Sequence, residues 1–184
     1  MTRFNYQEAQ HTMWQEIGST IVAEFSDIPD LATLTQITVR LFVAAVLGGL
    51  LGMERERKSK SAGTRTHMLV AVGAALFMIG PTLAGMSLGD LSRVIQGTIQ
   101  GIGFLGAGAI IISTAMGRVQ GLTTAASIWA TAGIGIAAGL GMEATAVLST
   151  AIVLFVLAIV PIFAKRAQEV PAGTPEESKS PPSS

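Results

Sequence analysis

Long runs of apolar residues, separated by short polar links, follow one another after residue 30. A helix that crosses the hydrocarbon of a bilayer needs about 20 mainly apolar residues. Five runs come close to that length, and we expect each to form a membrane helix. They cover residues 31–53, 67–84, 93–113, 122–140 and 144–163. Asp30 directly precedes the first run, where an N-cap residue is expected.

The two ends of the chain lack such runs. Before residue 31, apolar residues recur at helical spacing among glutamates, from Met13 and Trp14 to Phe25. This pattern predicts an amphipathic helix that lies on the membrane surface or on the bundle, with a frayed extension as the alternative. The last residues are rich in Pro, Ser, Glu and Lys, and we expect them to be disordered. The prediction is an all-α membrane protein with an N-terminal arm (1–30), a five-helix transmembrane domain (31–166) and a tail (167–184).

Basic residues predict the orientation of this bundle. Links rich in Lys and Arg stay on the cytoplasmic side of a membrane, and five such residues lie between positions 55 and 65. Alternating from there places Arg118 and the basic pair at 165–166 on the same side. The link that contains Asp90 is then expected on the outer side of the membrane. The expected topology has the N-terminus out and the C-terminus in.

Composition excludes several classes of protein. Hydrophobic residues make up 49% of the chain and charged residues 13%, whereas soluble domains carry about a quarter charged residues. The formal net charge is zero, so no basic surface predicts a nucleic-acid partner. Cysteine is absent, which excludes disulfides and thiolate sites. No hydrolase, zinc-protease or Walker motif occurs, so we expect neither an enzyme, nor a cofactor, nor a metal site.

The glycines of the third run form the string G-x-G-x-x-G. A dinucleotide site would also need a preceding strand and an acidic residue about 20 positions later, and neither is present. Small residues four apart let membrane helices approach closely, so we expect the third and fourth runs to pack tightly together. A broken helix that lines an ion path is the alternative. The expected packing residues are Gly97, Gly101, Gly103, Gly106, Gly108, Thr123, Thr124, Ala126 and Trp129.

Polar residues inside membrane spans are costly and therefore candidates for function. On the outer side these are Arg40, Asp90, Arg93, Gln96 and Gln100. Arg40 either extends its side chain to the outer surface or pairs with Asp90. Gln96 and Gln100 are four residues apart on one helix face, where they hydrogen-bond to a neighbouring helix or line a polar pocket.

A second polar cluster is expected on the cytoplasmic side. It comprises Glu54, Arg55, Arg65, Thr66, His67 and Arg118. A positive collar that binds lipid headgroups accounts for the basic residues of this region, Lys58 included, but not for a carboxylate. We therefore expect Glu54 to pair with Arg65 or Arg118. His67 has no other histidine near it in sequence, so the pattern favours an interfacial histidine over a metal ligand.

Four motifs resemble those of the MgtC/SapB family of bacterial membrane proteins. They are LLGMERE at 50–56, AGTRTH at 62–67, GIGFLGAG at 101–108 and GLTTAA at 121–126, the last followed by Trp129. Asp90 and Arg93 are similar to the family's Asp-x-x-Arg, whereas Gly97 departs from its usual glutamine. Larger members carry a soluble C-terminal domain, and this chain resembles the minimal form. The resemblance implies a bacterial inner membrane, a link to magnesium-limited growth and, in some pathogens, survival inside host cells.

Two functions follow as alternatives. The first is a non-enzymatic regulator that docks its small-residue faces on a membrane partner or on copies of itself. The second is an ion transporter or a channel component, with the ion unknown. Magnesium binds through carboxylates and waters, yet Asp90 and Glu54, on opposite sides, are the carboxylates near a membrane pathway. This scarcity favours the regulator.

Overall fold

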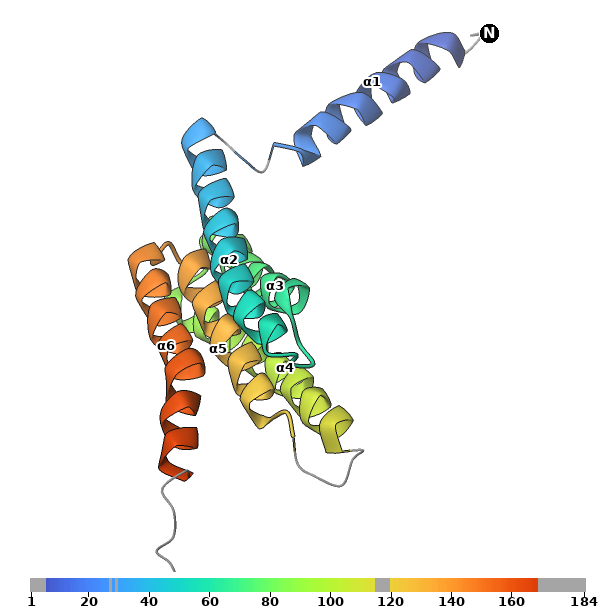
Figure 1. The fold of residues 1–184 in the computed structure, drawn as a ribbon. Coiled ribbons are helices and arrows are strands. Elements are labelled where there is room, and N and C mark those ends of the chain that lie inside the picture. The colour runs from blue at the N-terminus through green and yellow to red at the C-terminus, as the bar shows by residue number, and fades with distance from the viewer. Residues whose placement is uncertain (1–5, 27, 29, 115–119, 169–184) are drawn as a thin grey trace, which may run out of the picture.

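The protein, seen here as a computed structural model, is described over residues 6–26, 28, 30–114 and 120–168, which form six α-helices and no strand (Figure 1). The helices are α1 (Tyr6–Glu24), α2 (Leu31–Arg57), α3 (Thr64–Leu83), α4 (Leu88–Thr114), α5 (Leu122–Gly139) and α6 (Glu143–Gln168). Each predicted apolar run is a helix. The prediction for the tail falls, from residue 169 onward, outside the described residues.

Four of the described helices are long and apolar enough to cross a membrane, namely α2, α3, α5 and residues 143–160 of α6. The remaining helix of the bundle, α4, is 27 residues long and is not among these four. The all-helical membrane bundle is therefore confirmed. The fifth span and the orientation of the two termini stay predictions.

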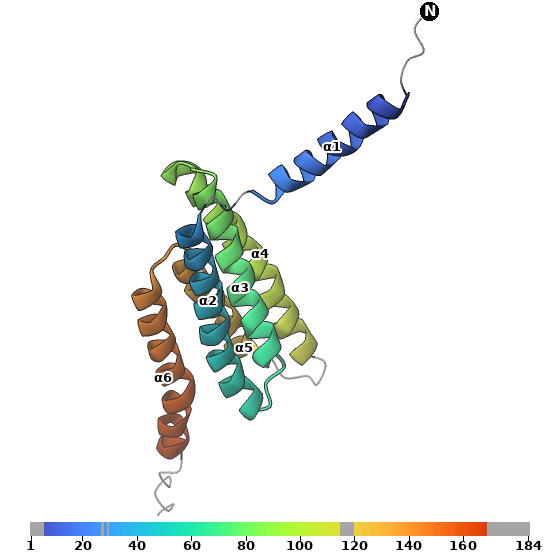
Figure 2. The same ribbon diagram turned by 90° about the horizontal axis from the view of Figure 1, so that it is seen from above.

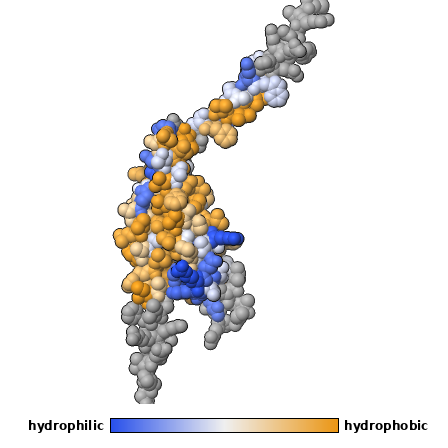
Figure 3. All heavy atoms as spheres, turned by 45° about the horizontal axis from the view of Figure 1, so that its top comes forward, coloured by the Kyte–Doolittle hydropathy of each residue, from blue (hydrophilic) through white to orange (hydrophobic). Residues whose placement is uncertain are grey.

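Helix α5 lies at the centre of the bundle and contacts α2, α3, α4 and α6 (Figures 1 and 2). Small side chains fill the space between these helices, and Ala44, Ala71, Ala138 and Ala146 are completely buried. Because alanine occupies little volume, helix axes can approach one another closely there. Large apolar side chains cover much of the outer surface instead (Figure 3).

Glycines bring the backbones of α3 and α5 into contact. A Cβ atom on Gly135 would lie 2.3 Å from the carbonyl oxygen of Ala71, and one on Gly139 would lie 2.5 Å from that of Ala75. Each pair is four residues apart on its helix, so the contact repeats once per turn. Gly48 makes a similar approach from α2, where an added Cβ would lie 2.6 Å from the carbonyl oxygen of His67 in α3.

Helix α4 packs against α5, as predicted for the third and fourth apolar runs, but four of the five glycines named for that contact take no part in it. The side chains of Ile102 and Ala109 pack there instead. Four of its glycines have nothing within 4 Å of an added Cβ, and Gly106 has only an ordinary contact at 3.5 Å. The open positions are Gly97, Gly101, Gly103 and Gly108. On α5, the side chains of Thr123, Ala126 and Trp129 are likewise exposed, whereas that of Thr124 is buried.

Helix α1 extends away from the bundle and, among the described residues, contacts no other helix (Figures 1 and 2). Its apolar side chains, among them Trp14 and Val22, are exposed. The short link to α2 ends at Asp30, whose Oδ1 accepts a hydrogen bond of 2.6 Å from the backbone N–H of Thr33. This bond holds the pKa of the Asp30 carboxyl below its usual range. The predicted N-cap is thus confirmed.

Candidate functional site

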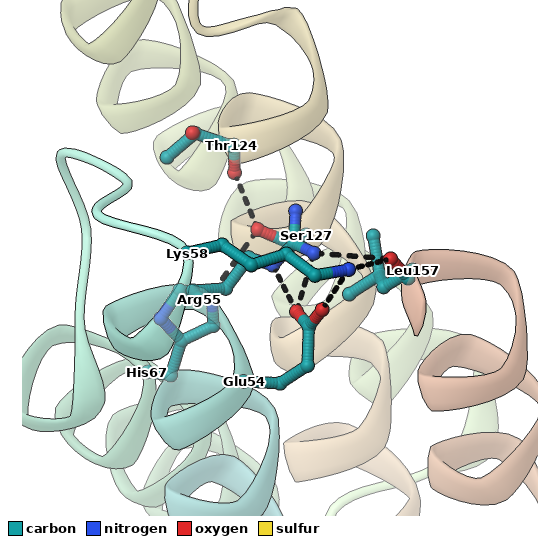
Figure 4. A network of polar contacts seen from close by, with 7 residues as sticks. All are labelled: Glu54, Arg55, Lys58, His67, Thr124, Ser127 and Leu157. Carbon is teal, nitrogen blue, oxygen red and sulfur yellow. Dashed lines mark hydrogen bonds and ion pairs between the residues drawn. The ribbon is translucent and has the colours of Figure 1, made fainter. Parts of the chain in front are cut away.

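Two cations surround the carboxylate of Glu54 near the end of α2. Arg55 donates to Glu54 Oε2, and the Nζ of Lys58 lies 2.7 Å from Glu54 Oε1 (Figure 4). The side chains of Glu54 and Arg55 are only 14% and 3% exposed. Charges that are withdrawn from water in this way are stable only when they are paired and hydrogen-bonded. The cluster therefore depends on all three side chains.

The same two cations bind a backbone carbonyl of α6. Lys58 Nζ donates to the oxygen of Leu157 at 2.7 Å, and Arg55 Nη2 donates to it at 3.4 Å (Figure 4). In an α-helix this oxygen would accept the N–H of the residue four positions on, but that residue is Pro161, which has none. The cations of α2 thus replace the missing helix bond and attach α2 to α6.

A buried chain of hydrogen bonds lies beside this cluster. His67 of α3 is fully buried, with Nδ1 2.9 Å from the carbonyl oxygen of Gly63 and Nε2 3.1 Å from Ser127 Oγ. Ser127 Oγ in turn donates to the carbonyl oxygen of Thr124 at 2.8 Å (Figure 4). Because a carbonyl only accepts, Nδ1 must carry a proton. His67 therefore connects α3 to α5 rather than facing the membrane interface.

The cytoplasmic cluster is thus only partly as predicted. Glu54 pairs with Lys58, one helical turn away, and with Arg55, so its predicted pairing with Arg65 is wrong. Arg65 and Thr66 are exposed on the first turn of α3, away from the buried carboxylate. Arg118, the other predicted partner, lies outside the described residues. Sequence analysis missed the carbonyl of Leu157, although a proline inside an apolar run was a signal for it.

On the opposite side, Arg40 caps the end of α5. Its Nη1 donates to the carbonyl oxygen of Gly139 at 3.2 Å. Helix α5 ends in a Schellman turn, in which Gly141 has a φ of +79° and the N–H of Met142 binds back to Ala137 at 2.9 Å. That turn leaves the Gly139 oxygen without a backbone donor, and the guanidinium supplies one.

The predicted pairing of Arg40 with Asp90 is wrong. Asp90 belongs to the first turn of α4, where Ser87 Oγ donates to its carboxylate at 2.7 Å. The backbone N–H of Asp90 donates back to Ser87 Oγ at 3.2 Å. This reciprocal pair satisfies the helix N-terminus locally, as capping residues do. Asp90 is exposed there, and so is Arg93 one turn later.

The outward face of α4, which comprises Arg93, Gln96, Gly97, Gln100, Gly101 and Phe104, is exposed. Within the described part of the chain, the amides of Gln96 and Gln100 have no hydrogen-bond partner. An apolar groove of about 670 Å³ runs beside this face between α3 and α4, and Gly97 and Gly101 form part of its lining. The amides and the groove together distinguish α4 from the other outward-facing helices.

Residues 41–166, which include the Glu54 cluster and the whole of α4, match the MgtC family. This chain belongs to the MgtC family. It is 40% identical over 131 residues to the protein named "Putative magnesium transporter YhiD" of Escherichia coli strain K12, covering 67% of this chain and 60% of that one. No solved structure matches it.

Two further relatives fit the same assignment. Protein SrpB of Synechococcus elongatus is 39% identical over 132 residues, which are 66% of this chain and 72% of that one. Protein MgtC of Salmonella paratyphi A is 38% identical over 141 residues, which are 77% of this chain and 59% of that one. The chain thus spans about 60% of the length of YhiD and of MgtC. Family membership and the four apolar helices make it a multi-pass membrane protein.

Proposed function

We propose that this protein is a non-enzymatic component of a bacterial inner membrane that supports growth when magnesium is scarce, and that it acts through helix–helix contacts. The magnesium link rests on the family and on the name that YhiD carries. The mode of action rests on one observation, the exposed face of α4, whose open glycines lie beside two amides that have no partner among the described residues.

The physics of the bilayer supports a contact at this face. No water is present in the hydrocarbon to bind an amide, and an unsatisfied polar group there costs several kcal/mol. Glutamine side chains that hydrogen-bond across helices remove that cost, and small residues beside them permit the close approach that this requires. Gln96, Gly97, Gln100 and Gly101 supply both features within two adjacent turns.

Transport is the second candidate, and the name of YhiD favours it. The buried charges argue against a magnesium path at the cluster of Glu54, Arg55 and Lys58. Glu54 is one carboxylate held by two cations, Arg55 and Lys58, so the cluster has a formal net charge of +1 (−1 + 2). A cation that approached it would be repelled and would have to displace two existing ion pairs.

Complementation of growth at low magnesium tests the proposal. The double variant Gln96→Met with Gln100→Met keeps the side-chain length and removes both amides. It should fail to support growth while reaching normal membrane levels on a blot. Gln36→Met is the matched control, because Gln36 is also an exposed glutamine but lies on α2, and it should grow like the unaltered protein.

Two results would contradict this function. Full growth of the double variant would remove the α4 amides from the mechanism. Magnesium flux into liposomes that contain only the purified protein would establish the transport candidate instead. A flux that the double variant retains would show in addition that α4 plays no part in it.

A further inference from the structure

We infer that the outward face of α4 binds the same face of a second copy of this chain, so that the protein is a parallel homodimer in the membrane. The inference rests on the proposed function and names the partner of its contact face. It starts from the spacing of the exposed residues. Gly97 and Gly101 are one helical turn apart, as in helix pairs whose backbones touch, and neither meets any atom within 4 Å of an added Cβ.

The depth of the two amides requires a partner. Helix α4 has 27 residues, which at about 1.5 Å per residue span roughly 40 Å and exceed the hydrocarbon thickness of about 30 Å. Residue 101 is the midpoint of the helix. In a membrane-spanning α4, Gln100 therefore lies close to the centre of the bilayer, and Gln96 lies one turn nearer its outer surface. Neither depth offers water as an alternative partner.

A second copy provides the matching groups at the matching depth. Two copies inserted in the same orientation are related by an axis along the membrane normal, so each residue meets its own counterpart. A glutamine amide both donates and accepts hydrogen bonds, so Gln100 is complementary to Gln100. Two glycines that face each other leave room for the two helix backbones to approach closely.

The outer end of α4 adds charge complementarity. Asp90 and Arg93 are both exposed and three residues apart, which is about 4.5 Å along the helix axis. In a parallel pair, Asp90 of one copy therefore lies within reach of Arg93 of the other, twice over by symmetry. A different membrane protein would have to supply an amide, a small surface and both charges at these same depths.

Disulfide crosslinking in intact membranes tests the inference, because the chain contains no cysteine. We compare Gly97→Cys on α4 with Ile152→Cys on α6. Both sites are exposed, and each lies nine residues after the first residue of its helix. With copper phenanthroline as oxidant, Gly97→Cys should form a covalent dimer and Ile152→Cys should form little. Equal crosslinking of the two sites would mean random collision in the bilayer and would overturn the dimer.

A second measurement, the mass of the assembled protein, tests the dimer without an introduced cysteine. The mass of the cysteine-free protein in nanodiscs should correspond to two chains, and Gln96→Met with Gln100→Met should weaken association about tenfold. Gly133→Leu on α5 is the control for Gly101→Leu, because both glycines are exposed and open, and only Gly101→Leu should reduce the dimer. A monomeric mass, or one chain bound to lipid or to another protein, would overturn the inference.

Growth at low magnesium separates this inference from the proposed function. If the double variant is monomeric and still grows, the dimer stands and the proposed function fails. If it loses growth while the unaltered protein is itself monomeric, the α4 face has another partner and the homodimer is overturned.

Discussion

Two glycines that are two residues apart on α5 should respond oppositely to alanine. At Gly133, an added Cβ has nothing within 4 Å. At Gly135, the Cβ would lie 2.3 Å from the carbonyl oxygen of Ala71 and 2.9 Å from its Cα. Since both positions are inside the same helix, the gain in helix propensity from glycine to alanine is nearly equal for the two, about 1 kcal/mol. Their difference therefore isolates the contact with α3.

The magnitude follows from the geometry. Ordinary contact begins near 3.4 Å, so α3 and α5 would have to separate by about 1.1 Å (3.4 − 2.3) at Gly135. The atom that is met belongs to the backbone and cannot rotate away. A gap of 0.5–1 Å already loses about a quarter to a half of the dispersion attraction, and overpacking costs about 1–3 kcal/mol. Gly133→Ala should stabilise the bundle by up to about 1 kcal/mol. Since Gly135→Ala has the same gain in helix propensity, the overpacking cost alone separates the two variants, by about 1–3 kcal/mol.

Unfolding with SDS from dodecylmaltoside micelles, followed by far-ultraviolet circular dichroism, would measure the free energy of each variant. Gly139→Ala should behave like Gly135→Ala, because its Cβ would lie 2.5 Å from the carbonyl oxygen of Ala75. Free energies for Gly133→Ala and Gly135→Ala that agree within about 0.5 kcal/mol, the usual effect of an uninvolved surface change, would refute the proposed backbone contact between α3 and α5.

Three further changes test other parts of the molecule. Glu54→Gln leaves two cations without their carboxylate and should lower stability by more than the ~1 kcal/mol of an exposed pair; adding Lys58→Met should recover part of the loss in the same SDS titration. Gly141→Ala should lower the melting temperature in detergent, because φ is +79° there and the new Cβ would lie 2.6 Å from the guanidinium that caps α5; an unchanged melting temperature would exclude that strain. In a Trp129→Phe background, brominated lipids should quench Trp14 fluorescence if α1 lies on the bilayer, and unquenched emission would place that helix in water.

The helices could be predicted because membrane insertion imposes a simple rule on sequence. A run of about 20 apolar residues must be helical, since lipid offers no partner for an open backbone. Helix α2 begins after Asp30 as the N-cap pattern predicts. The sequence predicted the ends of helices less accurately where they lie in polar links. Helix α2 continues to Arg57, beyond the apolar run that ends at residue 53. Its last turn is polar but still hydrogen-bonded, and apolarity carries no information about such a turn.

Which glycines pack could not be predicted, because small-residue spacing occurs on more than one helix. Gly135 and Gly139 repeat every four residues, and so do Gly97 and Gly101. Only the first pair faces another backbone, since α5 is surrounded by four helices and α4 lies at the edge of the bundle. The choice between them depends on helix arrangement, which a spacing rule does not contain.

The charged residues inside the spans show where a general expectation fails. Ionisable groups in membrane helices suggest function by default, yet Arg40 binds the free carbonyl at the end of α5, and Arg55 and Lys58 bind the carbonyl that Pro161 leaves free in α6. All three cations therefore complete backbone hydrogen bonding that lipid could not complete.

The amides of α4 lack such a role within the described chain. Gln96 and Gln100 are polar, lie where hydrocarbon is expected and satisfy no helix end. An exposed polar group that contributes nothing to the fold of its own chain only raises the free energy of the isolated protein in lipid. That penalty is removed when another helix binds the amides, so a binding partner in the membrane accounts for their position better than a role in folding does.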